Sequence, residues 1–336
     1  MVGIIFLLGT VMAALVDEVT SILFMTVIMI KILKCYNVDG KKVLPFIMFL
    51  VFTTNIGSSA LPIGNPVGVL VAFQAGFTIV DFLRWTLPIA IVASLVTTAI
   101  ALFYLRRVVS LNKLCPTSEG LEEVKASRDI KIAAGIFIFV IVGLILHSVI
   151  EQALGLATDT MLLGFPLLVA GIVLFINKSN AQALIMKVDW WTLLYFMLLF
   201  ASVGTLAYTG VTSTLATIIS HSASGLFGTM LVLGLSICFL TSFMDNVLAV
   251  ATFAPVVQAL VGTGIPLQPI WWIMLIGGTY FGNATIIGST ANIVAAGYLE
   301  KKNLGSFSQL GWIKVGVVVS AITFFLAFAL LYIQYI

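Results

Sequence analysis

Charged side chains are scarce in this sequence. Only 9% of its 336 residues are Asp, Glu, Lys or Arg, whereas apolar residues make up 61% and the mean hydropathy is +1.19. Soluble globular domains carry roughly 25% charged residues, so these values exclude a soluble domain. The apolar runs are each long enough for a membrane span of about 20 residues or for two shorter helices. The sequence therefore predicts an all-α polytopic membrane protein embedded in the lipid bilayer.

Other features are missing as well. The three cysteines, Cys35, Cys115 and Cys238, lack metal-ligand spacing and cannot all pair within the chain, so we expect structural roles for them and no cofactor. Residues 1–16 have no basic segment and no cleavage-like end, which argues against a secretory signal. The net charge of +3 comes from basic residues at the ends of predicted helices, so nucleic acid is not an expected partner.

Acidic residues interrupt two of the apolar runs. Asp17 and Glu18 lie in the run 2–33, and Asp245 lies in the run 228–261. Ionisable groups at membrane depth mark functional sites by default, because their charge must be compensated there. These acids therefore suit the binding of Na⁺ or the cycling of H⁺. The alternative is that the two aspartates cap the N-terminus of a half-helix, and both uses can coexist.

Each acidic run is followed by an apolar run that small and polar residues interrupt. These runs, 43–74 and 270–299, carry glycines that let the backbone unwind and neutral oxygens and amides that can replace a hydration shell. In the first of them Pro62 and Pro66 also stop helix continuation. Because the pair of runs occurs twice in the same order, we interpret the chain as one unit repeated. The predicted substrate-binding residues are Asn55, Gly57, Ser58, Ser59, Gly64, Asn65, Asn283, Thr285, Gly288, Ser289 and Asn292.

The acidic runs are predicted to be re-entrant hairpins. Each arm has about 15 residues and spans about 22 Å, which is short for a hydrocarbon core of about 30 Å. With both runs re-entrant, most basic residues fall on one face, which the positive-inside rule makes cytoplasmic. The second unit then has the opposite orientation, which is the inverted repeat of many secondary transporters. The residues on that face are Lys31, Lys34, Lys41, Lys42, Arg106, Arg107, Lys113, Lys125, Arg128, Lys131, Lys178, Lys187, Lys301 and Lys302.

This interpretation assigns the whole chain to regions of a transporter. Tryptophans that begin predicted helices, among them Trp271 and Trp272, are expected to be interfacial anchors. The predicted coupling-ion or proton residues are Asp17, Glu18, Asp245 and Asn246, and one hypothesis places Na⁺ at Asp17, Asn55, Asp245 and Asn283. The predicted regions are a first transport region over 1–105 (hairpin 2–33, broken helix 43–74, helix 82–105), a cytoplasmic linker over 106–131, scaffold helices over 132–227, and a second transport region over 228–336 (hairpin 228–261, broken helix 270–299, helix 309–336).

Motifs in these segments resemble a known superfamily. Residues 16–21 and 242–247 resemble the Ser-x-Phe-Leu-Asp-Asn-Val-Thr hairpin motif of the ion transporter superfamily, in the group of arsenite permeases, D-type sodium/proton antiporters and the P protein. Residues 54–66 are similar to that group's Ser-Asn-Ile-Gly-Gly-x-Ala-Thr-Leu-Ile-Gly-Asp-Pro-Pro-Asn, and residues 282–288 to its second-half partner. The resemblance covers nearly the whole chain. It implies a scaffold domain and a moving transport domain with an elevator-like motion, usually in a homodimer.

The sequence departs from that group's pattern at specific positions. Glu18 replaces the motif's Asn, Asn65 replaces the Asp after Ile-Gly, and Gly68 stands where Asn follows the prolines, which leaves the coupling ion open. The related dicarboxylate/sodium symporters have Ser-Asn-Thr at the hairpin tip. Here Asp17 and Asp245 stand in that triplet, which favours an inorganic ion over di- and tricarboxylates. Members also carry scaffold helices before the first hairpin, so the resemblance implies that these are missing here or come from a partner chain.

The sequence therefore predicts a secondary active transporter of the plasma membrane that exchanges an inorganic ion, arsenite or Na⁺, against H⁺ by alternating access. A citrate, dicarboxylate or other anion symporter of the same superfamily is one alternative. A truncated transporter or non-transporting membrane subunit is an alternative of another class. An enzyme is not expected, because neither membrane aspartate lies in the Gly-x-Gly-Asp or Tyr-Asp context of an intramembrane aspartyl protease.

Overall fold

The protein is helical wherever its structure is described. The computed structural model describes residues 1–336 except 37, 39, 109–127, 158–159, 189 and 223–224. Every element in the described ranges is an α-helix or a short 3₁₀-helix, and these ranges contain no strand. This confirms the predicted all-α class. The predicted linker 106–131 falls mostly outside the described residues.

Two described helices are long and apolar enough to cross a membrane on their own. They are the segment Ile79–Arg106 of α5 and the helix α15 (Gln309–Tyr335). The pair Leu163–Ile176 and Lys178–Met186 passes the same test together, with a bend of 94° between its members. Helices of 10–17 apolar residues make up much of the rest. Such short helices end inside the protein and must have their terminal backbone groups satisfied there.

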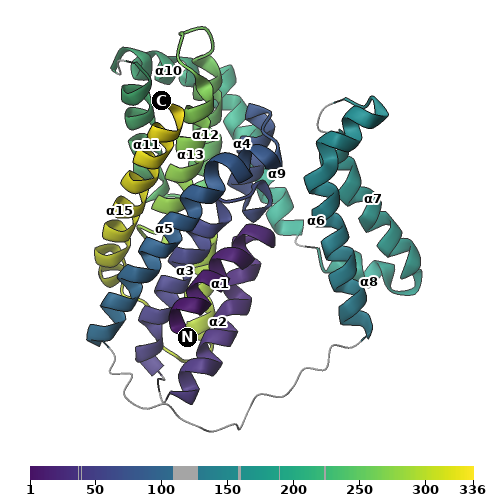
Figure 1. The fold of residues 1–336 in the computed structure, drawn as a ribbon, viewed down its shortest axis with the longest axis vertical. Helices are drawn as coiled ribbons and strands as arrows, with labels where there is room; N and C mark the ends of the chain where they lie inside the picture. The colour runs from purple at the N-terminus through teal and green to yellow at the C-terminus, as the bar shows by residue number, and fades with distance from the viewer. Residues whose placement is uncertain (37, 39, 109–127, 158–159, 189, 223–224) are drawn as a thin grey trace. The chain divides into compact units, whose positions relative to one another are not determined.

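The chain forms two compact units, of which the larger consists of Met1–Phe77, Asp81–Thr117 and Ser202–Ile336. Its elements from the first half of the chain are α1 (Val2–Leu15), α2 (Glu18–Cys35), η1 (Gly40–Val43), α3 (Leu44–Ser58), η2 (Pro62–Gly64), α4 (Pro66–Ala75) and α5 (Ile79–Val108). Those from the second half are α10 (Val211–Ser222), α11 (Gly225–Thr241), α12 (Asn246–Ala259), α13 (Leu267–Phe281), η4 (Ile286–Gly288), α14 (Thr290–Lys301) and α15 (Figure 1).

The smaller unit consists of Thr78–Val80 and Ser118–Ala201. It contains α6 (Arg128–Leu154), α7 (Thr160–Ile176), η3 (Lys178–Asn180), α8 (Ala181–Met186) and the beginning of α9 (Trp190–Tyr208). In it α6 packs along α7, with the rings of Phe139 and Phe165 5.3 Å apart. The assignment of residues 132–227 to a scaffold stays a prediction.

The interrupted helices follow the same backbone path twice. Between α3 and α4, Leu61 is extended (φ −136°, ψ 154°), one 3₁₀ turn follows, and Asn65 is extended again (φ −162°, ψ 164°). Between α13 and α14, Thr285 (φ −133°, ψ 165°), a 3₁₀ turn and Ser289 (φ −149°, ψ 140°) repeat this path. In both, the second extended residue is the N-cap of the next helix. We refer to residues 59–65 as the first interruption and to residues 282–289 as the second.

The helices that follow the interruptions pack on the opposite half of the chain. Before the interruptions, α1 packs on α3, and α11 packs on α13. After them, α4 packs against α12 and α13, whereas α14 packs against α2 and α3. The two halves of the larger unit therefore share one core and do not form separate domains.

The tryptophans expected at a membrane interface lie inside this core. Trp271 is 4% exposed and Trp272 is fully buried. The Trp272 ring stacks on Phe77 with ring centroids 4.1 Å apart and meets Phe82 edge to face at 4.9 Å. The expectation of interfacial anchors was wrong for this pair, because α13 is covered on several sides by neighbouring helices and its apolar residues all point into protein.

Two glycines allow helices to approach the interruptions closely. A Cβ atom on Gly57 would lie 2.4 Å from the carbonyl oxygen of Thr10 in α1. A Cβ atom on Gly316 of α15 would lie 2.3 Å from the carbonyl oxygen of Asn283 in the second interruption. Both contacts are with backbone, which cannot move aside as a flexible side chain would. Glycine at these positions therefore sets the separation of the packed helices.

We expect Gly57→Ala to lower the free energy of unfolding by about 1–3 kcal/mol, the usual cost of overpacking a core. The matched control is Gly135→Ala in α6, because no atom lies within 4 Å of an added Cβ there. That variant should be neutral or more stable by about 0.5–1 kcal/mol, since alanine favours a helix over glycine. Thermal unfolding of both variants in one detergent checks this expectation. Equal melting temperatures would show that the close approach does not limit packing.

Candidate functional site: the two helix interruptions

Three buried asparagines join the two interrupted helices. The amide nitrogen Nδ2 of Asn55, at the end of α3, donates to Oδ1 of Asn283 at 2.7 Å and to Oδ1 of Asn292 at 2.9 Å. All three side chains are fully buried. Asn55 and Asn283 are 228 residues apart, and the same spacing separates Asp17 and Asp245. Side chains at matching positions of the two halves thus bind each other directly.

The same asparagines also donate to backbone carbonyl groups of α3 and of the second interruption. Asn292 Nδ2 donates to the carbonyl oxygens of Gly282 at 2.7 Å and Thr285 at 2.8 Å. Asn283 Nδ2 donates to the carbonyl oxygen of Phe52 at 3.2 Å. Unpaired buried carbonyl groups are costly, so these bonds stabilise an otherwise unfavourable backbone.

Glu18 connects the first acidic position to both interruptions. Its Oε2 accepts a hydrogen bond from Ser58 Oγ at 2.9 Å, and its Oε1 accepts a longer one from Ser289 Oγ at 3.4 Å. Ser58 ends α3 and Ser289 begins α14, so one carboxylate contacts both broken helices. Glu18 is only 2% exposed. A single side chain therefore contacts the points where both broken helices lose their regular structure.

The surroundings of Glu18 are acidic or neutral. Asp17 and Asp245 interact with it electrostatically as like charges, and Asn246 lies beside it. Asn246 is 1% exposed and neither of its amide atoms has a hydrogen-bond partner in the described part of the chain. No lysine or arginine occurs among the buried side chains of the described residues. Burying an ionised carboxylate is costly unless it is paired, so Glu18 needs a proton or a cation that the surrounding side chains do not supply.

The two aspartates cap helices. Asp17 accepts from the backbone N–H groups of Val19 at 3.1 Å and Thr20 at 2.9 Å at the start of α2. Its φ of 141° lies in the region that favours glycine, which costs about 1–3 kcal/mol. Asp245 accepts from the N–H of Val247 at 2.9 Å at the start of α12 and from Thr290 Oγ1 at 2.8 Å. Both aspartates therefore make the contacts expected if they cap the N-terminus of a half-helix.

Asn65 and Ser289 cap the helices after the interruptions. Asn65 Oδ1 accepts from the N–H of Gly68 at 2.6 Å, and its Nδ2 donates to Ser58 Oγ at 2.6 Å. Ser289 Oγ accepts from the N–H of Ala291 at 3.2 Å. These two caps are neutral, in contrast to the aspartates that cap α2 and α12.

Other predicted residues lie at the interruptions without joining this network through their side chains. Ser59 Oγ donates to the carbonyl of Ile56 in its own helix at 2.7 Å, and Thr285 Oγ1 donates to the carbonyl of Ser242 at 2.7 Å. Gly57, Gly64 and Gly288 permit close backbone contacts. The hypothesis of Na⁺ at Asp17, Asn55, Asp245 and Asn283 stays a prediction, and the described residues hold no group of three His, Cys, Asp or Glu side chains suited to a metal ion. The predicted residues that the structure brings together are Glu18, Asn55, Ser58, Asn65, Asn246, Asn283, Ser289 and Asn292.

Some residues of this region were not predicted from the sequence. Trp312 of α15 donates from Nε1 to the carbonyl oxygen of Asn283 at 2.9 Å and is 1% exposed. Thr241 and Tyr280 are fully buried, and their hydroxyl groups have no hydrogen-bond partner in the described ranges. A tryptophan in the first turn of a long apolar helix looks like an interfacial anchor, so the sequence contains no signal for its role here.

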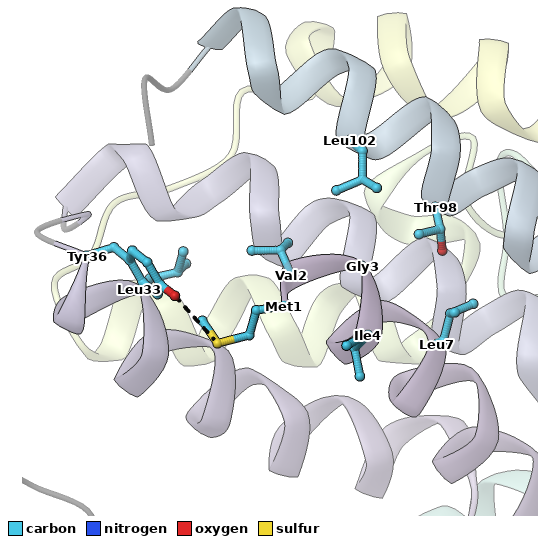
Figure 2. Close-up of a pocket in the computed structure, with 9 residues that line it drawn as sticks. All are labelled: Met1, Val2, Gly3, Ile4, Leu7, Leu33, Tyr36, Thr98 and Leu102. Carbon is cyan, nitrogen blue, oxygen red and sulfur yellow. Dashed lines mark hydrogen bonds between the residues drawn. The ribbon is translucent and has the colours of Figure 1, made fainter. Parts of the chain in front are cut away.

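A separate pocket in the larger unit is apolar. It has a volume of about 490 Å³ and lies among the start of α1, the end of α2 and α5 (Figure 2). In it the Tyr36 hydroxyl donates to the Met1 sulfur at 3.5 Å. The pocket offers no charged group to an ion. Its lining residues are Met1, Val2, Gly3, Ile4, Leu7, Leu33, Tyr36, Thr98 and Leu102.

Comparisons with known proteins agree on a transporter. A family model described as "Citrate transporter" matches residues 1–277. The chain is 32% identical to the "46 kDa membrane protein" of Mycobacterium leprae, over 99% of this chain and 77% of that protein. It is 28% identical to the "Uncharacterized transporter Rv2684" of Mycobacterium tuberculosis, over 98% and 76%. The human P protein is 26% identical over 94% of this chain, which spans 46% of that longer protein.

We expect Asn55→Ala to destabilise the protein strongly. It leaves Oδ1 of Asn283 and Oδ1 of Asn292 buried without the donor they now share, at a cost of about 1–3 kcal/mol for each unsatisfied group. The control is Asn177→Ala, which removes an exposed amide bonded to its own helix at 2.9 Å and should change stability by less than about 0.5 kcal/mol. Thermal unfolding in detergent measures both. Similar melting temperatures for the two variants would contradict the assigned role.

Proposed function

Because the chain belongs to the citrate transporter family, we propose that it is a secondary active transporter that moves a small ion across the membrane by alternating access, with a cation bound at Glu18 as the coupling ion. One observation carries the proposal. The buried carboxylate of Glu18 contacts both broken helices at once, through Ser58 at the end of α3 and Ser289, the N-cap of α14. A cation that binds there stabilises one arrangement of the two broken helices, and this differential binding is what coupling requires.

The ends of the helices indicate where a solute with negative charge binds. Four helices, α2, α4, α12 and α14, begin next to the interruptions, and helix N-termini attract anions. Asp17 and Asp245 compensate this charge at α2 and α12. Asn65 caps α4 without a charge, whereas the start of α14 lies beside Glu18, which contacts Ser289, and Asp245, which contacts Thr290. An anion therefore meets a more favourable potential near the start of α4 than near the other three helices.

Two classes of solute fit the site. An inorganic ion, arsenite or Na⁺ moved against H⁺, agrees with the acidic residues at the two turns. A citrate-like anion moved together with a cation agrees with the matched family model and with the neutral cap of α4. In both cases the cation at Glu18 and the solute occupy neighbouring positions.

The proposed architecture is an inverted repeat with re-entrant hairpins at 2–33 and 228–261. The common spacing of the matching asparagines and aspartates, the repeated backbone path of the interruptions and the exchanged packing of α4 and α14 support it. Residues 132–227 are the proposed scaffold. The proposed assembly is a homodimer in the plasma membrane, with the basic loops on the cytoplasmic side and an elevator-like motion of the transport regions.

In proteoliposomes, we expect flux of citrate, arsenite or Na⁺ to respond to an imposed H⁺ or Na⁺ gradient. Glu18→Gln should remove this response, because the amide has nearly the same shape and no charge to attract a cation. Asp17→Asn and Asp245→Asn are the matched controls, since Asn caps a helix about as well as Asp. They should keep at least half of the gradient response. The solute that moves identifies the class.

Unchanged coupling in Glu18→Gln would refute the role of that carboxylate. Loss of coupling in Asp245→Asn alone would assign the role to the second acidic turn instead. Absence of flux for all three solutes, with the protein folded by its melting curve, would contradict transport of these ions.

The proposed sidedness predicts that Lys41→Cys and Lys302→Cys react with a membrane-impermeant maleimide only from the cytoplasm. Arg84→Cys should react only from the other side. All three native side chains are exposed, and the variants are made after replacement of the native cysteines by alanine. If run 228–261 were a full span, positions 41 and 302 would label from opposite sides. Labelling of intact cells and inverted vesicles distinguishes the two arrangements.

A further inference from the structure

We propose that Ser58 and Ser289 are a pair of positioning hydroxyls that pass cation occupancy at Glu18 to Asn55, and through Asn55 to both interruptions. This inference rests on the proposed coupling role of Glu18 and specifies how that role reaches the second half of the chain. Each serine lies between an oxygen of Glu18 and an oxygen of Asn55.

The distances place each hydroxyl between two acceptors. Ser58 Oγ is 2.9 Å from Oε2 of Glu18 and 2.8 Å from the carbonyl oxygen of Asn55. Ser289 Oγ is 3.4 Å from Oε1 of Glu18 and 3.3 Å from Oδ1 of Asn55. In each pair the two distances differ by little, so geometry alone does not select one acceptor.

A serine hydroxyl has one proton to donate, so it cannot serve both acceptors at full strength. Each hydroxyl oxygen also accepts a hydrogen bond: Asn65 Nδ2 donates to Ser58 Oγ at 2.6 Å, and the N–H of Ala291 donates to Ser289 Oγ at 3.2 Å. These bonds hold the oxygen atoms in place and leave only the proton free to rotate. Each serine therefore donates either to Glu18 or to Asn55.

The charge of Glu18 decides between the two orientations. Hydrogen bonds to an ionised acceptor are roughly twice as strong as those between neutral groups, so an unoccupied carboxylate draws both serine protons. A bound cation compensates the carboxylate, and the protons then turn to Asn55. Glu18, Ser58, Ser289 and Asn55 are all at most 2% exposed, so bulk water does not replace the missing donor at either end.

Asn55 carries the change across the two halves. Its amide nitrogen donates to Asn283 and Asn292, and hydrogen bonds in a buried chain polarise one another. A donor gained or lost at its amide oxygen therefore alters the bonds that hold the second interruption. The bonds of Asp17 and Asp245 in the described residues go to Val19, Thr20, Val247 and Thr290, and none of them is to Ser58 or Ser289.

The test follows a reporter in the second interruption. Ile287→Cys is placed in a background without native cysteines, because Ile287 is 46% exposed and lies in η4. The rate of maleimide labelling is measured in detergent. One series compares NaCl with choline chloride and tests Na⁺. A second series compares the rate before and after a step to acidic pH and tests H⁺. We expect one of the two cations to change the rate in the parent by about fivefold or more, the lower range of coupling between sites.

The serine variants decide the inference. In the double variant Ser58→Ala/Ser289→Ala the labelling rate should no longer depend on the cation. The single variants Ser289→Ala and Ser289→Thr are also compared with each other. Ser289→Thr keeps the hydroxyl and the N-cap, so it should retain most of the cation dependence that Ser289→Ala loses. Thr97→Ala is the control, because Thr97 is also fully buried and donates to a carbonyl of its own helix α5, outside the two interruptions. It should respond as the parent does. Melting curves exclude variants that have not folded.

Two results would overturn the inference: a parent reporter that responds to neither cation, or a double serine variant that responds as the parent does. Flux measured on the same preparations separates this inference from the proposed function. If Glu18→Gln removes gradient-coupled flux but either of these labelling results is obtained, Glu18 couples transport by a route that does not involve the serines. Absence of any gradient-coupled flux removes the proposed function, and this inference falls with it.

Discussion

The hydrogen bonds of Asn55 to Asn283 and Asn292 are the interaction on which the rest of this structure depends. A helix that stops inside a membrane protein leaves backbone donors and acceptors without partners, and lipid offers none. Here buried amides bond the two interrupted helices to each other and to backbone carbonyl groups of both. The two breaks are therefore parts of one connected hydrogen-bond network.

The acidic residues of this site divide into two uses. Asp17 and Asp245 stabilise the starts of helices, where their charge meets the positive end of a helix dipole. Glu18 instead accepts from the hydroxyls of Ser58 and Ser289, and Asn246 lies beside it. Its position corresponds to that of Asn246 in the second half, which is neutral and has no hydrogen-bond partner in the described residues. The two halves therefore have a similar backbone path but differ in charge at the matching positions 18 and 246. This difference agrees with the proposal that one coupling cation binds.

The sequence predicted the bounds of the larger helices within a few residues, because proline, glycine and asparagine inside an apolar run usually mark the place where a helix breaks. The polar residues that it singled out in the two interrupted runs are ones that the structure brings together. The sequence did not reveal the contacts of Glu18 with Ser289, which is 271 residues away, because such contacts depend on how helices cross in three dimensions. For the same reason the roles of Trp312 and Trp272 were missed, since burial by distant helices leaves no local pattern. Nor did the sequence reveal that Asp245 bonds to Thr290 of α14 while it caps α12.

The exchanged packing of α4 and α14 bears on how the protein is made. The first half of the chain emerges from the ribosome and enters the membrane before α12 and α13 exist, yet α4 packs against both of them. Until the second half arrives, α4 lacks these two partners and Asn55 lacks its hydrogen bonds to Asn283 and Asn292. Long-range contacts of this kind form late in folding. A chain in which the three asparagines are joined is therefore one whose two halves have both been made and packed together.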